Sequence, residues 1–106
     1  MYNKTGKRRF GKDSIMENYP TYLFRRFIDN DEQTYNAIIM VKKDTIKNIP
    51  EEKERIIFME TYLGELFTSL TKPAHSMPFI YDDIINYIRG EINFYSIAKE
   101  ILKEDS

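Results

Sequence analysis

Apolar side chains recur at helical spacing in the second half of the chain. Between Pro50 and Leu70 they stand three or four residues apart, which places them on one face of an α-helix. A proline at the start and glutamates directly after it are typical of a helix N-terminus. The pattern therefore predicts a helix over 50–70. Its predicted buried stripe comprises Ile56, Met59, Leu63, Leu66 and Leu70.

Gly64 lies inside this predicted helix. Glycine in a helix interior costs about 1 kcal/mol relative to alanine. A second helix that crosses closely at this point would account for the glycine. The sequence therefore predicts a close helix contact at Gly64.

Two shorter helices are predicted after a proline-containing loop at 72–78. The first covers 78–89, because proline suits the start of a helix and Gly90 suits its end. The second covers 93–103, where Asn93 can cap the first turn. Their predicted inward residues are Ile80, Ile84, Ile85 and Ile88, and then Phe94, Ile97, Ala98 and Ile101. The core is accordingly expected to come mainly from the three C-terminal helices.

The segment 19–42 fits two interpretations. A helix over 19–29 places Tyr19, Leu23 and Phe27 on one face. A β-hairpin within 21–42 also suits the β-branched and aromatic composition. The helix is slightly favoured at 19–29, whereas the continuous apolar run within 35–42 predicts a short strand. The predicted fold class is mainly α, with the strand or hairpin as an α+β alternative.

Charge is segregated at the N-terminus. Residues 1–12 carry five basic side chains and no acid, so the other 94 of the 106 residues sum to −6 against a net charge of −1. We therefore expect a flexible, disordered basic arm over 1–13 and a single small globular domain over 14–106. Seven Phe, eight Tyr and 42% hydrophobic residues supply an ample core for one domain.

The sequence has no pattern typical of a catalytic site. The single histidine, His75, stands in a proline-flanked loop without a partner at a spacing that suggests a proton relay. Asp82 and Asp83 are adjacent and would not face each other on a helix, where the helix dipole explains them. No glycine-rich phosphate loop is present. These observations predict a non-enzymatic protein.

Metal, cofactor and membrane sites are also not indicated. With no cysteine and one histidine, only an all-oxygen metal site remains, and the acidic run at 29–32 lacks the spacing of a calcium loop. A polar turn explains this run better, and no cofactor is expected. No apolar run approaches the roughly 20 residues of a membrane span. The absence of cysteine fits a reducing compartment, so we expect a cytoplasmic protein without a membrane partner.

The basic arm supports the leading functional hypothesis. Lysine and arginine on a flexible segment neutralise nucleic-acid phosphates, and arginine can enter a narrow minor groove. The predicted contact residues are Lys4, Lys7, Arg8, Arg9 and Lys12, with Arg25 and Arg26 as second-rank candidates. We therefore expect an accessory or regulatory protein that binds nucleic acid, with DNA favoured over RNA.

The two C-terminal helices have about the lengths of a helix-turn-helix, with a glycine at the turn. Their exposed side chains mix acids with lysines, however, which does not suit a recognition helix. The plainer expectation is an antiparallel helix pair in a small bundle.

The rival hypothesis is an adaptor or inhibitor that binds protein through its acidic, aromatic helical body. A small core would leave several large side chains uncovered, and such surfaces commonly form two-fold symmetric dimers. The predicted uncovered residues are Ile57, Phe58, Tyr62, Phe67, Tyr81, Tyr87 and Tyr95. A homodimer is therefore expected, and it is compatible with a DNA-binding arm. The alternative is that these residues complete the core of a monomer.

Overall fold

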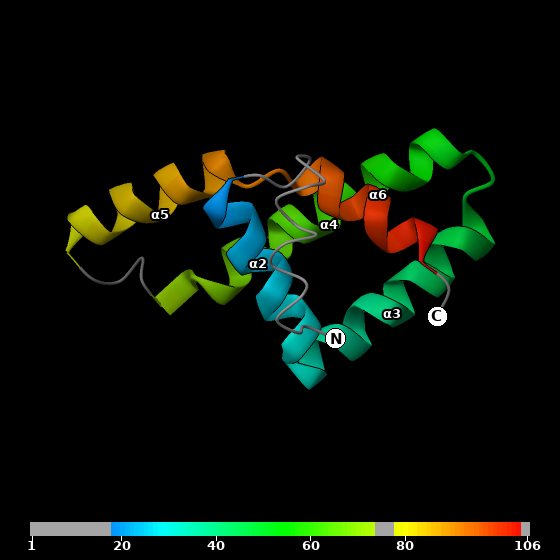
Figure 1. Cartoon of the computed structure of the whole chain (residues 1–106), viewed down its shortest axis with the longest axis horizontal. Coiled ribbons are helices and arrows are strands. Elements are labelled where there is room, and N and C mark those ends of the chain that lie inside the picture. Colours follow the sequence, from blue (N-terminus) through cyan, green and yellow to red (C-terminus); the bar gives the residue numbers. More distant parts are fainter. Residues whose placement is uncertain (1–17, 74–77, 105–106) are drawn as a thin grey trace.

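The computed structural model of the chain describes residues 18–73 and 78–104, and within these ranges the backbone is mainly helical and contains no strand. The helices are α2 (Tyr19–Asn30), α3 (Glu32–Asn48), α4 (Glu52–Leu70), α5 (Phe79–Glu91) and α6 (Phe94–Lys103) (Figure 1). The mainly α fold class is confirmed. The helices predicted over 50–70, 78–89 and 93–103 correspond to α4, α5 and α6.

The strand predicted at 35–42 is wrong, because this segment lies inside α3. The carboxylate of Asp31 caps the helix by accepting hydrogen bonds from the backbone N–H and the hydroxyl of Thr34, at 3.1 and 2.7 Å. The apolar run does not form a buried ribbon: Ile38 is buried, whereas Met40 is 67% exposed. The cap, followed by one buried residue per turn, therefore favours a helix over a strand.

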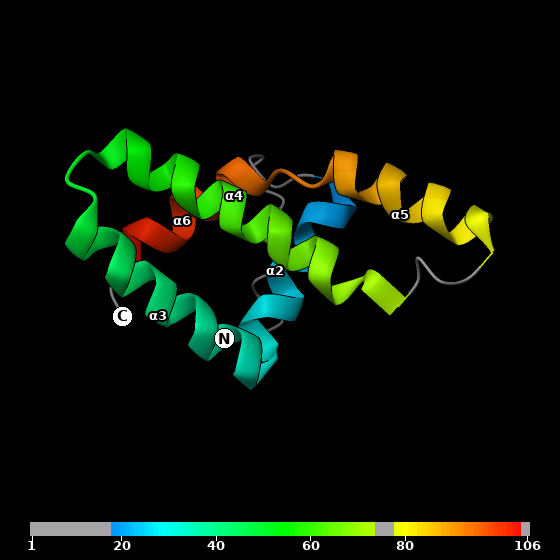
Figure 2. The ribbon, with the colours of Figure 1, turned by 180° about the vertical axis from the view of Figure 1, so that it is seen from behind.

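α2, α3, α4 and α6 build the core. α6 and α3 pack against α4, and α2 packs against α3 and α6 (Figures 1 and 2). The buried apolar residues are Phe24, Ile28, Ile38, Ile56, Met59, Leu63, Phe67, Ile92, Ile97, Ala98 and Ile101. α2 and α3 thus contribute to the core, although the sequence pattern assigned it mainly to α4, α5 and α6.

Three aromatic rings join α2, α4 and α6. Phe24 lies edge-on to Phe67 and to Phe94, with ring centroids 5.6 Å apart in both pairs. Phe67 and Phe94 complete the triangle at 6.2 Å. Edge-to-face pairs add roughly 0.5–1.5 kcal/mol beyond the area that they bury, so this cluster fixes the crossing of the three helices.

Cationic side chains secure the helix ends. Lys42 of α3 is buried, and its ammonium donates to the backbone carbonyl of Glu104, directly after α6. Arg55 of α4 donates to the carbonyl of Ile46, at 3.0 Å, and to that of Ile49. The last carbonyls of a helix lack partners within the helix and carry partial negative charge. Each cation therefore stabilises a helix end while it ties that end to a second helix.

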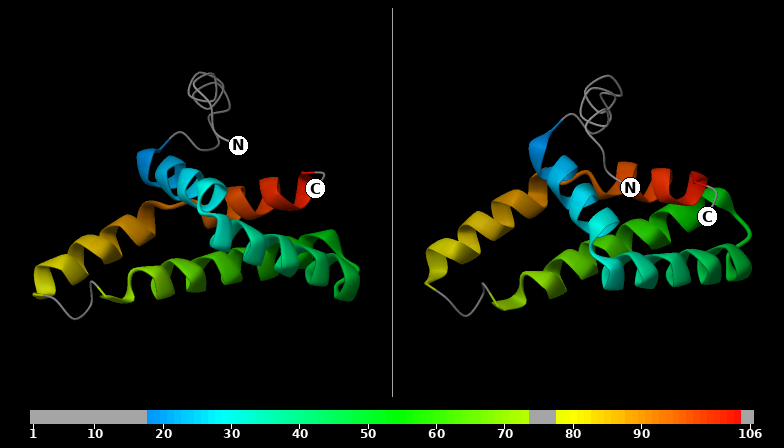
Figure 3. Two further views of the ribbon diagram at one scale, coloured as in Figure 1. Left: turned by 90° about the horizontal axis from the view of Figure 1, so that it is seen from below. Right: turned by 60° about the horizontal axis from the view of Figure 1, so that its bottom comes forward.

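α5 departs from this arrangement, because it contains no buried residue. Ile85 and Ile88 are partly buried against the core, but Ile80 and Ile84 are 56% and 48% exposed. In two further views α5 extends away from α2 and α6 toward its N-terminal end, which lies nearer to the C-terminal end of α4 than the rest of α5 does (Figure 3). The prediction that α5 supplies core residues is thus wrong for the first two of its four isoleucines.

The close approach predicted at Gly64 comes from a side chain of α5 and not from a crossing backbone. A Cβ on Gly64 would lie 3.1 Å from Nη2 of Arg89. The same guanidinium donates to the carbonyl of Gly64 at 3.4 Å and to the hydroxyl of Thr68 at 3.2 Å. Glycine at this position therefore leaves room for the contact that joins α5 to α4.

Replacing Lys42 by methionine tests its role at the end of α6. The substitution keeps the volume but leaves the Glu104 carbonyl without its donor, so we expect the free energy of unfolding to fall by about 1–3 kcal/mol. Urea unfolding followed by circular dichroism measures the change. Lys43→Met is the matched control, because Lys43 is exposed on the same helix and should shift stability by less than about 0.5 kcal/mol. Equal effects of the two substitutions would contradict the capping role.

Candidate protein-interaction surface

A polar cluster holds the C-terminal end of α5. The carbonyl of Glu91 accepts hydrogen bonds from Nδ2 of Asn18, at 2.7 Å, and from the hydroxyl of Thr21, at 3.4 Å. The backbone N–H of Asn93 donates to the same hydroxyl at 2.8 Å. Thr21 is fully buried, so this end of α5 is fixed against α2.

The N-terminal half of α5 exposes the large side chains of Phe79, Ile80, Tyr81 and Ile84. Its N-cap residue, Pro78, makes no side-chain capping hydrogen bond. The guanidinium of Arg89, which lies 5.8 Å from the ring centre of Phe94, is near the other end of the helix. The first two turns of α5 therefore present large apolar side chains to solvent.

Large apolar side chains line the exposed part of α5. Ile80, Ile84 and Tyr87 stand at i, i+4 and i+7, which is the spacing of one helix stripe. We define the α5 apolar edge as Phe79, Ile80, Tyr81, Ile84 and Tyr87. Their exposed fractions run from 47% at Tyr81 to 79% at Phe79. A stripe of this kind normally faces a protein core, yet here the described helices leave it exposed.

A second, smaller stripe lies on α2. Tyr19, Leu23 and Phe27 share one face, as the sequence predicts, but this face points outward with exposed fractions of 67%, 41% and 41%. The buried face of α2 is formed by Thr21, Phe24 and Ile28. Spacing alone therefore identified a stripe and not the direction in which it faces.

The other predicted uncovered residues give a mixed result. Ile57, Phe58 and Tyr95 are exposed by 50%, 49% and 41%, in agreement with the prediction. Tyr62 is partly buried, and Phe67 is buried at 8% exposure because it belongs to the aromatic triangle. The exposed members on α5, Tyr81 and Tyr87, form part of the α5 apolar edge.

Arg25 lies within an ion-pair network between α2 and the end of α6. Its guanidinium contacts the carboxylates of Asp29 at 3.1 Å, Glu104 at 2.6 Å and Glu100 at 4.0 Å, and its side chain is 14% exposed. Burial would by itself lower the pKa of Arg25, but the surrounding carboxylates outweigh burial and raise that pKa. Arg25 therefore serves the packing of α6, and a phosphate contact would require these ion pairs to break.

Most of the residues predicted to contact nucleic acid lie outside the part of the chain that the structure describes. Lys4, Lys7, Arg8, Arg9 and Lys12 lie outside the described residues, as does His75. Arg26 is exposed on the outer side of α2. The two second-rank candidates thus differ in exposure, since the side chain of Arg25 is 14% exposed and Arg26 is exposed.

The acidic candidates have structural roles in part. Within the run at 29–32, Asp29 pairs with Arg25 and Asp31 caps α3, so the polar turn joins two helices. Asp83 is exposed in the first turns of α5 beside Asp82. The described residues contain no group of three or more acidic or histidine side chains arranged to hold a metal ion.

The helix-turn-helix interpretation does not match the arrangement of α5 and α6. The two helices are joined by Ile92 and Asn93 and continue in the same general direction in opposite views (Figures 1 and 2). α6 packs on α4, whereas α5 lies against α2. The antiparallel pair expected from the sequence is likewise not formed.

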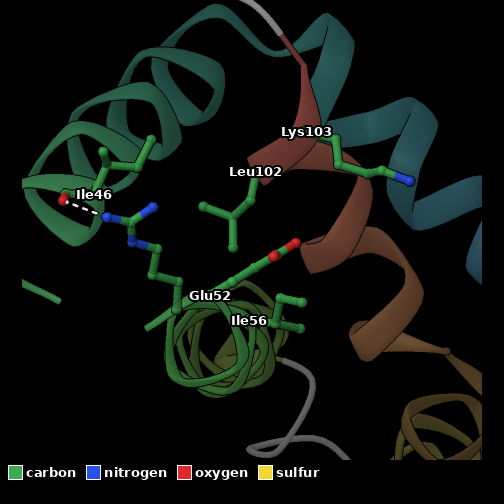
Figure 4. Close-up of a pocket in the computed structure, with 6 residues that line it drawn as sticks. Ile46, Glu52, Ile56, Leu102 and Lys103 are labelled. Atoms are coloured by element: carbon green, nitrogen blue, oxygen red, sulfur yellow. Dashed lines mark hydrogen bonds between the residues drawn. The ribbon is translucent and has the colours of Figure 1, made fainter. Parts of the chain in front are cut away.

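One surface pocket lies where the end of α3, the start of α4 and the end of α6 meet (Figure 4). It has a volume of about 150 Å³ and is lined by Ile46, Glu52, Arg55, Ile56, Leu102 and Lys103. Small-molecule sites usually enclose about 300–1,000 Å³. This pocket has room for little more than one side chain, so it does not indicate a substrate site.

The sequence matches no protein-family model, and no curated protein or solved structure is significantly similar to it. None of the helices in the described ranges is long and apolar enough to span a membrane. The candidate function therefore depends on the surfaces of the described helices and on the charge pattern of the sequence.

The α5 apolar edge was only half accessible to sequence reasoning. Tyr81 and Tyr87 were predicted to be uncovered, but Ile80 and Ile84 were assigned to the core. The apolar residues of α5 span about two-thirds of its circumference when they are placed at about 100° per residue. That width was the available signal, because a helix with so wide an apolar arc needs more cover than one neighbour provides.

The cap of α3 predicts a pH dependence of stability. Hydrogen bonds from the hydroxyl and then from the backbone N–H of Thr34 lower the pKa of Asp31 below its ordinary value of 3.8. The resulting stability is present above that ordinary value and is lost as the pH falls through the lowered pKa. Asp31→Asn can still cap the helix but should flatten the acid limb of stability against pH, measured by urea unfolding between about pH 5 and pH 2.

Asp44→Asn is the control for this measurement, because Asp44 is an exposed aspartate on the same helix. We expect its acid limb to resemble that of the wild type. An unchanged limb in Asp31→Asn would contradict the assigned role of the cap.

Proposed function

We propose that this chain is a non-enzymatic protein-interaction protein, of the adaptor or inhibitor kind, whose α5 docks onto another polypeptide. The observation that carries the proposal is that α5 contains no buried residue and exposes the five large side chains of its apolar edge. Soluble monomers rarely expose contiguous apolar patches beyond a few hundred Å², and larger patches commonly mark interaction sites.

The way in which α5 is held in place supports docking in preference to a structural role. A helix of 13 residues has little stability of its own in water. The cluster of Asn18, Thr21 and Glu91 holds its C-terminal end in place, so a partner would meet a helix that is already formed. Preorganisation of this kind lowers the entropic cost of binding.

The stripe of α5 fits a known mode of recognition. Amphipathic helices bind hydrophobic surfaces through anchors at i, i+3 or i+4, and i+7, which is the spacing of Ile80, Ile84 and Tyr87. Asp83 lies beside this stripe and adds negative charge at its border. The favoured partner surface is therefore an apolar stripe of about the same length.

Photo-crosslinking from Tyr87 tests the docking role. Replacing Tyr87, which is 69% exposed, by a photoreactive phenylalanine analogue should leave the fold intact and yield adducts to a polypeptide in the native cell extract. Mass spectrometry of the adduct identifies the residue that faces α5. Tyr35 on α3, exposed by 43%, is the matched control and should give markedly fewer adducts. No adduct at position 87, or equal yields at the two positions, would contradict the proposal.

A second candidate function is nucleic-acid binding through the N-terminal arm. Its support is the charge pattern: residues 1–12 carry five basic side chains and no acid, whereas the described residues carry eleven Lys and Arg against fourteen Asp and Glu. The proposed phosphate contacts are Lys4, Lys7, Arg8, Arg9 and Lys12, with Arg26 as a second-rank candidate. DNA remains favoured over RNA because a basic arm can enter the minor groove of duplex DNA.

The salt dependence of binding tests this second candidate. Fluorescence anisotropy with duplex DNA, single-stranded DNA and RNA should give a log–log slope of about −4 to −5 per chain on duplex, as expected for five phosphate contacts. A variant with all five basic residues of 1–12 changed to glutamine keeps the length of the arm and should lose the slope. Absence of binding to all three nucleic acids at low salt would rule out the candidate.

A further inference from the structure

We infer that the polypeptide docked on α5 is a second copy of this chain, in a two-fold symmetric dimer whose α5 helices pack antiparallel through the α5 apolar edge. The inference rests on the proposed docking function of α5 and names its partner. It is carried by the exposed area of the edge, by the spacing of its residues and by the position of α2.

The exposed apolar area matches what one side of a stable dimer needs. The exposed fractions of Phe79, Ile80, Tyr81, Ile84 and Tyr87 correspond to on the order of 500 Å², with fully exposed aromatic side chains taken at about 200 Å² each. A stable interface buries about 800 Å² per partner, of which roughly 57–65% is apolar. The α5 apolar edge therefore supplies about the apolar area that one partner contributes.

The spacing of the stripe is self-complementary. In an antiparallel pair centred on Ile84, this residue meets its own copy at the symmetry axis, and Ile80 of each copy lies opposite Tyr87 of the other. Two-fold interfaces require such a pattern, because the same patch must serve both partners. Each isoleucine or tyrosine of the stripe thereby meets another apolar side chain.

The position of α2 favours the antiparallel orientation. α2 crosses at the C-terminal end of α5, where Asn18 and Thr21 bind the Glu91 carbonyl (Figure 1). A parallel pair would bring two copies of α2 to the same end of the contact. An antiparallel pair places them at opposite ends, and Phe79 at the tip of each α5 then lies toward the body of the other copy.

The other apolar surfaces of the described residues fit a second copy less well. The stripe of Tyr19, Leu23 and Phe27 on α2 has three members, two of them less than half exposed. The pocket between α3, α4 and α6 accepts about one side chain, at about 150 Å³. Neither provides the area that a dimer of this size requires.

Sedimentation equilibrium of the full chain tests the dimer. We expect twice the chain mass of 12.7 kDa at micromolar concentrations. Ile84→Asp places a carboxylate on each side of the symmetry axis, and a tenfold penalty per copy would raise the dimer dissociation constant about 100-fold. Ile57→Asp is the matched control, since Ile57 on α4 is 50% exposed and Ile84 is 48% exposed, and it should leave the constant within about twofold.

Cysteine crosslinking tests the same contact without a charge in the interface. The chain has no native cysteine, so single substitutions report single positions. Ile84→Cys should give a crosslinked dimer with a short bis-maleimide. A mixture of Ile80→Cys and Tyr87→Cys should crosslink far more than either variant alone, because these positions face each other only in the antiparallel pair.

The outcomes separate the inference from the proposed function. A monomeric wild type at about 100 μM, or equal effects of Ile84→Asp and Ile57→Asp, would overturn the second copy as partner. Crosslinks within Ile80→Cys alone and within Tyr87→Cys alone would overturn the antiparallel orientation. A monomer that still gives adducts from position 87 to a different protein would overturn the inference and leave the docking function standing. A monomer without such adducts would overturn both.

Discussion

The packing of α6 along α4 is the contact on which the other helices depend. Met59, Leu63, Ile97 and Ala98 are fully inaccessible to solvent at this interface, and the small side chain of Ala98 lets the two helices approach closely. Toward the end of α4, the ring of Phe67 packs edge-on against the ring of Phe24. α6 and α3 pack against α4, whereas α5 packs against α2 and contacts α4 through the side chain of Arg89. The exposed face of α5 thus follows from how the core is filled.

Helix ends in this protein are joined by cations that donate to backbone carbonyls. Lys42 and Arg55 each come from one helix and donate to a carbonyl in the last turn of another helix or directly after it. A carbonyl without a partner inside a protein costs free energy, so these contacts are specific in a way that apolar packing is not. Apolar burial brings the helices together, and the cations determine where their ends meet.

The sequence predicted where the helices lie along the chain better than it predicted which helices pack against one another. The predicted stripe of α4 is buried at Ile56, Met59 and Leu63, although Leu70 at its end is 42% exposed. α3 was misassigned because its continuous apolar run lacks helical spacing. Its buried positions include Lys42 and Thr45, and polar residues give no signal of burial in the sequence. Arg25 was assigned to phosphate because its partner Glu104 lies 79 residues away. Local spacing reports which residues share a face, but only tertiary contacts decide which face is covered.

The near symmetry of the α5 apolar edge about Ile84 affects how many copies of the chain can associate. An exposed patch that fits a different surface of the same chain adds copies without limit, whereas a patch that fits itself closes after two. Ile80 lies four residues before Ile84 and Tyr87 lies three residues after it, and the acidic and amide side chains of Asp83 and Asn86 lie outside the stripe of these three residues. Pairing through this edge would remove this exposed apolar area from water in both chains. Neither chain of the pair would then have a free copy of the patch with which to bind a third chain.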